Sequence, residues 1–277
     1  MTDQTIPLAG VIGSPIAHSK SPRIHRHWLT VMDLPGHYVP MNVSPENLAE
    51  VLRTLPKAGF VGANITIPHK EKVLGLVDIV TDRAALIGAA NTLIFGKDGK
   101  IHADNTDGYG FINNLKNAPC GWDGANGPAA VLGAGGASRA VIVALLDAGV
   151  PEILLSNRTR MRADALAQEF GKRIRVFDWR QAGNMLEHCA TVVNTTSLGM
   201  VGQPSLDVPL QGLQKGAVVT DIVYAPLRTQ LLETAEEMGC HTVDGLGMLL
   251  HQAVPGFERW FGKRPEVDAA TRDAALR

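Results

Sequence analysis

The sequence predicts an α/β fold in two domains, and three observations lead to that prediction. Short runs of β-branched residues alternate with longer amphipathic runs, which is typical of βαβ units and parallel sheets. The alternation starts again after residue 128, where a glycine-rich turn separates a strand-like run from a helix-like run. At 277 residues the chain is long for a single hydrophobic core, which favours two domains of ordinary size over one large domain.

The first half contains three strand-like runs, each followed by a segment with helical spacing. The strand-like runs are AGVIG, HYVPMNV and VGANITI, and the helix-like segments are residues 21–34, SPENLAEVLRTL and KEKVLGLVDIV. Ser21 precedes Pro22 and is the expected N-cap of the first helix, because proline loses no hydrogen bond at the first helical position. His25 and His27 face different ways on that helix and are expected at the surface. Farther on, NTLIFGKDGKIHADN predicts a β-hairpin with an Asp-Gly turn.

The second half repeats the alternation from residue 128 to the DIVY segment at 221–224. Its strand-like runs are PAAVL, EILLS, RIRVF, ATVVN and GAVVTDIVY. Residues 117–128, NAPCGWDGANGP, are rich in glycine, proline and asparagine, so we interpret them as a connection near which the two domains meet. The last segment, GLGMLLHQAVPGFERWFGKRP, has apolar residues at helical spacing, and Pro255 is expected to kink that helix.

Composition narrows the class of partner. The formal net charge is −1, from 26 basic and 27 acidic residues, and no Lys/Arg run is present. Nucleic acid and membrane surfaces are therefore not expected partners, and a small-molecule ligand is. Because the sequence contains neither a bilayer-length apolar run nor a signal-peptide pattern, we expect a soluble, cytoplasmic protein. Cys120, Cys189 and Cys240 are too widely spaced for a CxxC metal or redox motif, so no metal site is expected.

The glycine-rich turn predicts a dinucleotide site. Gly133 permits a tight turn, and Gly135 lets the backbone approach a pyrophosphate at the N-terminus of the next helix. The alternative, a glycine turn with a purely structural role, is less favoured because both the strand and the helix of the motif are present. The residues predicted to contact the cofactor here are Gly133, Ala134, Gly135, Gly136 and Ala137.

The end of the next strand predicts NADP as the cofactor. NAD sites usually carry an acidic residue about 20 residues after the glycine turn, to bind the ribose 2′-hydroxyl. This chain instead has amide, guanidinium and hydroxyl donors, which suit a 2′-phosphate. The predicted donors are Asn157, Arg158, Thr159 and Arg162, whereas Arg160 could equally be a surface residue of the following helix.

Polar residues also interrupt apolar runs near several predicted strand ends of the first half. Buried amides and hydroxyls cost free energy unless they are paired, so one or two in a strand can belong to a hydrogen-bonded core. A cluster of them instead predicts a ligand rich in oxygen. The cluster comprises Ser19, Ser21, Asn64, Thr66, Lys70, Asn91, Asn105 and Asp107.

Taken together, these motifs resemble those of the shikimate dehydrogenases. SPIAHSKSP, GANITIPHK, AANTL, DNTDGYGF, GAGGASRA, NRT, NTTSLGM, DIVY and DGLGMLLHQA occur in that family's order between about residues 8 and 265. The resemblance implies NADPH-dependent, reversible reduction of 3-dehydroshikimate to shikimate. It also implies a substrate-binding domain with a mostly parallel sheet, residues 1–106, completed by C-terminal helices in 245–277 that pack back on it. Residues 107–244 would form the Rossmann domain, and the active site would lie in the cleft between the domains.

The resemblance further assigns roles to single residues. Lys70 is expected to be the acid/base residue, with Asp107 beside it, because hydride leaves an alcohol carbon readily only as the hydroxyl proton also leaves. A solvated lysine that opens the following helix is the alternative for Lys70. The residues expected to bind substrate are Ser19, Ser21 and Tyr224 for the carboxylate, and Asn64, Thr66, Lys70, Asn91, Asp107 and Gln252 for the hydroxyls. Asp82, Thr195, Ile222 and Gly245 join the residues expected to contact the cofactor.

Two other functions compete with this interpretation. A quinate/shikimate dehydrogenase would share the motifs but would accept quinate and often NAD. A catalytically silent NADP-binding sensor is disfavoured by the presence of both Lys70 and Asp107. The sequence does not fix the oligomeric state, and a homodimer is an open alternative.

Overall fold

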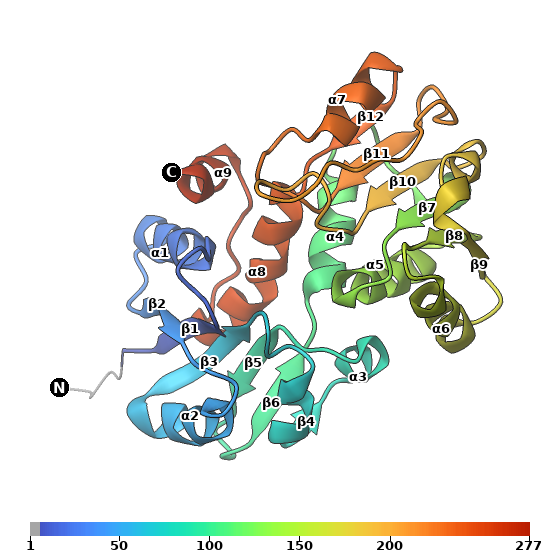
Figure 1. The fold of residues 1–277 in the computed structure, drawn as a ribbon. Helices are drawn as coiled ribbons and strands as arrows, with labels where there is room; N and C mark the ends of the chain where they lie inside the picture. The colour runs from blue at the N-terminus through green and yellow to red at the C-terminus, as the bar shows by residue number, and fades with distance from the viewer. Residues whose placement is uncertain (1–5) are drawn as a thin grey trace. The chain divides into compact units, whose positions relative to one another are not determined.

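The computed structural model describes residues 6–277, which form two compact α/β units (Figure 1). Unit 1 contains the chain up to Thr106 together with Leu250–Arg277, and unit 2 contains Asp107–Leu249. The predicted fold class is confirmed, because each unit is built around a six-stranded sheet. Within residues 6–277, no helix combines the length and the hydrophobicity needed to cross a bilayer.

The sheet of unit 1 is mostly parallel. In spatial order its strands are β2 (His37–Asn42), β1 (Leu8–Gly13), β3 (Phe60–Ile65), β5 (Thr92–Phe95), β6 (Ile101–Asp104) and β4 (Ile79–Val80). Strand β1 pairs in parallel with β2 and β3, and β4 pairs in parallel with β6. Strand β5 is antiparallel to both neighbours, and a backbone bond from Gly96 N to Lys100 O closes the predicted β5–β6 hairpin. The carboxyl ends of β1, β3 and β6 therefore lie at the edge where β5 begins.

The helices of unit 1 include the C-terminal ones, as predicted. They are α1 (Ser21–Val31), α2 (Leu48–Thr54), α3 (Asp82–Ile87), the part of α8 (Leu246–Phe261) from Leu250 onward, and α9 (Ala269–Leu276). Helix α9 packs against α1, where Trp28 Nε1 donates to Thr271 Oγ1 at 3.1 Å. Trp260 Nε1 of α8 donates to Leu93 O of the sheet at 3.0 Å. Helix α8 continues through Pro255 as a single element.

Three local predictions for unit 1 are wrong. Lys20, whose backbone is already helical, occupies the N-cap of α1, and Ser19 Oγ accepts from Ser21 N at 3.4 Å. Ser21 therefore begins the helix instead of capping it. His25 is fully buried, because it lies on the face of α1 that carries Ile24 and Trp28. The segment KEKVLGLVDIV forms only a 3₁₀ helix, Lys72–Leu76, and the short strand β4.

Unit 2 is a Rossmann sheet in which every strand is parallel to its neighbours. In spatial order its strands are β12 (His241–Val243), β11 (Val218–Asp221), β10 (Thr191–Asn194), β7 (Ala129–Leu132), β8 (Ile153–Ser156) and β9 (Ile174–Phe177). The strands that follow β7 extend to one side as β8 and β9 and to the other as β10 to β12. The strand order therefore reverses between β7 and β10, which is where ligands bind in open α/β sheets.

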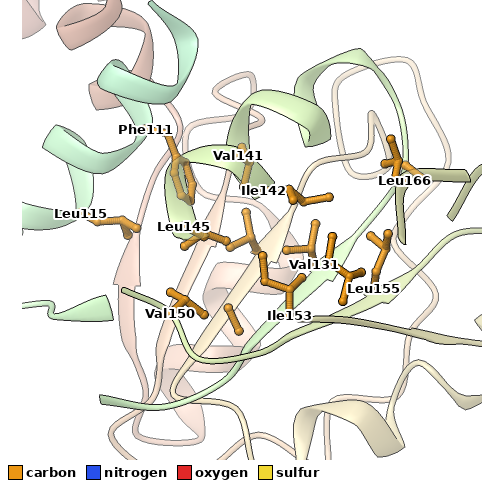
Figure 2. Packing of buried hydrophobic residues seen from close by; sticks show 14 of the residues in the cluster. Phe111, Leu115, Val131, Val141, Ile142, Leu145, Val150, Ile153, Leu155 and Leu166 are labelled. Carbon is orange, nitrogen blue, oxygen red and sulfur yellow. The ribbon is translucent and has the colours of Figure 1, made fainter. Parts of the chain in front are cut away.

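Helices α4 (Asp107–Lys116), α5 (Gly136–Asp147), α6 (Arg160–Phe170) and α7 (Gln230–Glu237) accompany this sheet. One buried cluster joins strand residues such as Val131 and Leu155 to Leu145 of α5, Phe111 of α4 and Leu166 of α6 (Figure 2). The apolar runs of β7 and β8 are fully covered, as expected for parallel strands buried on both faces. The packing of this core holds the carboxyl ends of β7 and β8 in place, and the loops that follow these two strands start from there.

Residues 117–128 lie inside unit 2, whose chain begins at Asp107, so the interpretation of this segment as the connection between the domains is wrong. Trp122 is buried in the core cluster of unit 2, and its Nε1 donates to Thr191 Oγ1 at 2.9 Å. Asp123 Oδ1 accepts from Ala125 N and starts a 3₁₀ helix, Gly124–Asn126. The glycine-rich composition had indicated a connection, but a single tryptophan side chain anchors the segment.

Candidate substrate and cofactor sites

The polar residues of unit 1 lie at one edge of its sheet. Asn64 is near the end of β3 and pairs across the sheet with Thr92, and Thr92 pairs in turn with Asp104 at the end of β6. Asn91 immediately precedes β5, and its backbone N donates to Asp104 O. Ser19 and Ser21 follow β1 at the same edge. A methyl group on Gly13, the last residue of β1, would lie 2.6 Å from the Thr66 side chain.

A buried hydrogen-bond network links most of these residues. Asn64 Nδ2 donates to Asn91 O at 3.0 Å and to Thr92 Oγ1 at 3.3 Å. Asn91 Nδ2 donates to Gln252 Oε1 of α8 at 3.0 Å. Thr106 donates from its backbone N to Asn91 Oδ1 at 2.9 Å and from its hydroxyl to Gln252 O. Asn64 and Gln252 are 188 residues apart in the sequence, and the fold of unit 1 places both in one network.

Tyr38 and His25 belong to this region, and the sequence analysis did not single out Tyr38 at all. Tyr38 Oη donates to Asn64 Oδ1 at 2.6 Å, and its phenol is also hydrogen-bonded to the Ser21 side chain. The His25 ring stacks on the Tyr38 ring with centroids 3.9 Å apart. Burial raises the pKa of Tyr38 well above 10.0 and lowers the pKa of His25 to about 3, so both rings are neutral at physiological pH. One sequence signal could have identified Tyr38: in the HYVP segment of β2 it is an aromatic residue with a polar tip in a strand, and such a residue usually finds a hydrogen-bond partner when it is buried.

Lys70 and Asp107 lie in different units, and each is positioned by its own unit. Lys70 is half-buried in the turn after β3, where its backbone O accepts from Ala90 N at 2.8 Å. Asp107 is the first residue of α4 and is 9% exposed. A carboxylate in the first turn of a helix is stabilised by the helix dipole. The helix that follows Lys70 is a short 3₁₀ helix, Lys72–Leu76, and not the α-helix that the sequence predicted.

The glycine turn of unit 2 lies at the switch point between β7 and β10. Gly133 has a φ of +110°, and a methyl group at this position would lie 2.7 Å from Thr195 Oγ1, so only glycine fits the turn. Thr195 follows β10 and donates to Leu132 O at 2.8 Å. Methyl groups on Gly135 and Gly136 would meet nothing within 4 Å in residues 6–277, so the backbone that starts α5 is accessible. These features fit a dinucleotide pyrophosphate.

The loop after β8 presents the donors expected for a 2′-phosphate. Asn157 lies beside the glycine turn, where its Oδ1 accepts from Ala134 N at 3.1 Å. Arg158 and Arg162 are exposed and form no ion pair within the described chain, residues 6–277. Arg160 instead pairs with Asp178 at 2.7 Å, which favours the surface role for this residue. The guanidinium of Arg158, which follows the end of β8, suits phosphate recognition.

The loops after β10 and β11 meet through a buried carboxylate that the sequence analysis missed. Asp221, the last residue of β11, is 1% exposed and accepts hydrogen bonds from Asn194, Val223 and Thr229. Burial raises its pKa above 3.8, and the three donors oppose that rise. Ile222 N donates to Asn194 O, and a methyl group on Gly245 would lie 2.5 Å from Ile222 O. The structure thus gathers the predicted Thr195, Ile222 and Gly245 at one end of the Rossmann sheet.

The two remaining predicted site residues, Asp82 and Tyr224, lie in α3 and in the loop after β11. Asp82 is exposed in the first turn of α3. A negative charge there interacts favourably with the helix dipole, so stabilisation of α3 is a structural role that accounts for this residue. Tyr224 is half-buried in the loop after β11, and burial raises its pKa. The structure identifies no group of three or more potential metal ligands among residues 6–277.

A Rossmann unit with an NADP-type donor set, joined to an α/β unit with a polar sheet edge, defines a two-domain, dinucleotide-dependent oxidoreductase. Family models described as the shikimate dehydrogenase substrate binding domain, shikimate/quinate 5-dehydrogenase and the shikimate 5′-dehydrogenase C-terminal domain match residues 11–93, 123–203 and 245–272. The chain belongs to the shikimate dehydrogenase family.

Individual relatives are similar over the full length. The chain is 68% identical to a shikimate dehydrogenase (NADP(+)) of Cereibacter sphaeroides over 100% of this chain and 99% of the relative. It is 65% identical to that of a Ruegeria species over 100% of both. A crystal structure of shikimate 5-dehydrogenase from Thermus thermophilus in complex with NADP(H) and shikimate superposes with a TM-score of 0.86 at 36% identity, covering 97% of this chain and 98% of that one.

Proposed function

We propose that this protein catalyses the NADPH-dependent, reversible reduction of 3-dehydroshikimate to shikimate. The observation that carries the proposal is the end-to-end similarity, at 68% identity, to a relative named shikimate dehydrogenase (NADP(+)). The site geometry agrees with this proposal, because the residues after β8 are hydrogen-bond donors that suit a 2′-phosphate. The acidic residue of an NAD site is not found there.

We propose that the first domain, residues 1–106 completed by 245–277, binds the substrate and that residues 107–244 bind NADP. The substrate-binding family model on residues 11–93 and the Rossmann topology of unit 2 support this division. Within the NADP-binding domain, the glycine turn would hold the pyrophosphate, Arg158 the 2′-phosphate, and the residues after β10 and β11 the nicotinamide. The proposed cofactor contacts are Gly133, Ala134, Gly135, Gly136, Ala137, Asn157, Arg158, Thr159, Arg162, Thr195, Ile222 and Gly245, with Asp82 the least supported.

We propose that Ser19, Ser21 and Tyr224 bind the substrate carboxylate and that the amide-rich edge of unit 1 binds its hydroxyls. The network that fixes Asn64, Asn91 and Gln252 supports the second assignment, because a polyhydroxylated ring needs several donors and acceptors in fixed directions. The proposed hydroxyl contacts are Asn64, Thr66, Lys70, Asn91, Asp107 and Gln252.

Lys70 and Asp107 are the proposed acid/base couple. NADP, when bound, accepts the hydride from the alcohol carbon of shikimate or, as NADPH, returns it to the ketone. In the oxidative direction Lys70 takes the hydroxyl proton as the C–H bond breaks, so that the carbon–oxygen double bond forms without a charged alkoxide. In this proposal Asp107 accepts a hydrogen bond from the Lys70 amino group, and this bond keeps the amino group directed at the reacting oxygen.

Initial rates with shikimate or quinate, each with NADP or NAD, test the proposal. We expect shikimate with NADP to give the highest kcat/KM. A clear preference for quinate with NAD would identify a quinate dehydrogenase, and no turnover with any pair would favour a silent NADP-binding sensor.

The cytoplasm remains the predicted location. A homodimer remains a prediction, which size-exclusion chromatography with light scattering tests through the molar mass.

A further inference from the structure

A buried carboxylate, Asp221, lies under the loops after β10 and β11. Its Oδ1 accepts from Asn194 Nδ2 and Val223 N, both at 2.9 Å, and its Oδ2 accepts from Thr229 Oγ1 at 2.8 Å. All three donors are neutral groups, and the side chain is nearly removed from solvent. Burying a carboxylate is costly, so its presence here calls for a role beyond filling space.

The three donors come from the end of β10 and from the loop after β11, at the carboxyl edge of the sheet. Asn194 ends β10, and its Oδ1 accepts from Thr196 N at 3.0 Å and from Thr196 Oγ1 at 2.7 Å. Val223 lies in the loop after β11, and Thr229 precedes the first residue of α7. Asp221 therefore joins the loop 195–199 to the loop 222–229, neither of which forms a helix or a strand.

The same two loops carry residues assigned to the nicotinamide end of the cofactor under the proposed function, on which this inference rests. Thr195 immediately follows Asn194, and Ile222 immediately follows Asp221. We propose that Asp221 is a positioning residue. It accepts hydrogen bonds from Asn194, at the end of β10, and from the loop 222–229, and thereby holds Thr195 and Ile222 in the arrangement that receives the nicotinamide half of NADP. The adenosine half is left to the glycine turn and the loop after β8, and the three donors to Asp221 come from neither of these segments.

Substitutions of Asp221 can distinguish its role as a hydrogen-bond acceptor from the effect of its negative charge. In Asp221→Asn, the remaining oxygen can accept from Asn194 and Val223, and the new amide can donate to the Thr229 hydroxyl, which rotates to accept. The variant therefore keeps the three connections without the charge. Asp221→Ala removes all three, and Thr229→Val removes only the connection to α7.

The test measures equilibrium dissociation constants of the full-length protein for two ligands by isothermal titration calorimetry. NADP contacts both halves of the site, whereas adenosine 2′,5′-bisphosphate contacts the adenosine half alone. We expect Asp221→Ala to weaken NADP binding by about tenfold or more and bisphosphate binding by less than about twofold, the loss of NADP affinity corresponding to one or two buried hydrogen bonds. Asp221→Asn should bind both ligands within about threefold of wild type, and Thr229→Val should show a smaller NADP-specific loss.

Several outcomes overturn the proposal. An unchanged NADP affinity in Asp221→Ala, or an equal loss for both ligands, would show that the carboxylate does not act on the nicotinamide half. A loss in Asp221→Asn as large as in Asp221→Ala would show that the charge matters and not the hydrogen bonds. If Asp221→Ala fails to fold, an NADP-specific loss in Thr229→Val decides for the proposal and its absence decides against it. Wild-type protein that binds both ligands but does not oxidise shikimate would refute the proposed activity, whereas the proposed NADP site, the part of the proposed function that this inference uses, would stand.

Discussion

Replacing His25 with phenylalanine should make the protein less sensitive to acid. The His25 ring is fully buried and stacked on Tyr38, and burial lowers its pKa from 6.5 to about 3. The unfolded ring therefore takes up a proton below about pH 6.5, whereas the folded ring stays neutral until about pH 3. Its contribution to stability is complete above pH 6.5 and is lost as the pH falls toward 3. Linkage gives a loss in the free energy of unfolding of about 2 kcal/mol between about pH 7.5 and pH 5, and of about 4 kcal/mol by about pH 3.

The assay is urea unfolding at about pH 7.5 and about pH 5, followed by tryptophan fluorescence. Phenylalanine keeps a planar ring against Tyr38 but adds volume, so His25→Phe will lose some stability at both pH values, and that loss does not depend on pH. The informative quantity is the change in the free energy of unfolding between the two pH values. This change should be about 2 kcal/mol smaller in His25→Phe than in wild type. Trp28→Phe, a change in the same aromatic cluster without a titratable group, should keep the wild-type difference. An equal pH dependence of the free energy of unfolding in His25→Phe and in wild type would refute the reasoning.

Three further predictions concern the proposed sites. Lys70→Ala should lower kcat by about 100-fold or more while changing the KM for shikimate much less, as expected for a group that acts in the transition state; an almost unchanged kcat would remove lysine from the mechanism. Arg158→Ala should raise the KM for NADP and leave that for NAD unchanged, whereas equal effects would show that the arginine does not bind the 2′-phosphate. Gly133→Ala should destabilise the protein by about 1–3 kcal/mol and weaken NADP binding, because alanine must adopt a positive φ and displace Thr195; a wild-type melting temperature would contradict this.

The sequence predicted the features that depend on local patterns. The alternation of apolar runs indicated the parallel sheets, and the glycine turn indicated the switch point between β7 and β10. Both signals are local, because strand periodicity and the positive φ at Gly133 are properties of short segments. The hairpin at Asp98-Gly99 was predictable for the same reason.

The errors arose where long-range packing determines the outcome. Trp122 lies in a stretch with the composition of a linker, yet its indole reaches Thr191, 69 residues away, and anchors the segment. His25 looked like a surface residue, because spacing alone does not show which helix face packs against Phe257 and Trp260 of the distant helix α8. Asp221 looked like part of a motif, and only the fold reveals that Asn194, 27 residues earlier in the chain, donates to its carboxylate.

The structure also determines how an amide would meet a ligand, which no sequence pattern specifies. Asn64 can donate two hydrogens and accept at one oxygen, so from the sequence it could serve a substrate hydroxyl as either donor or acceptor. In the fold, Nδ2 faces Asn91 O and Thr92 Oγ1, and a backbone carbonyl can only accept, which fixes the orientation of the amide. Both hydrogens of Asn64 are thereby used within unit 1, and Oδ1 is left facing Tyr38 Oη. A substrate hydroxyl that binds Asn64 must therefore donate to Oδ1, so an analogue whose hydroxyl is replaced by fluorine should lose this contact while one carrying an amine should keep it.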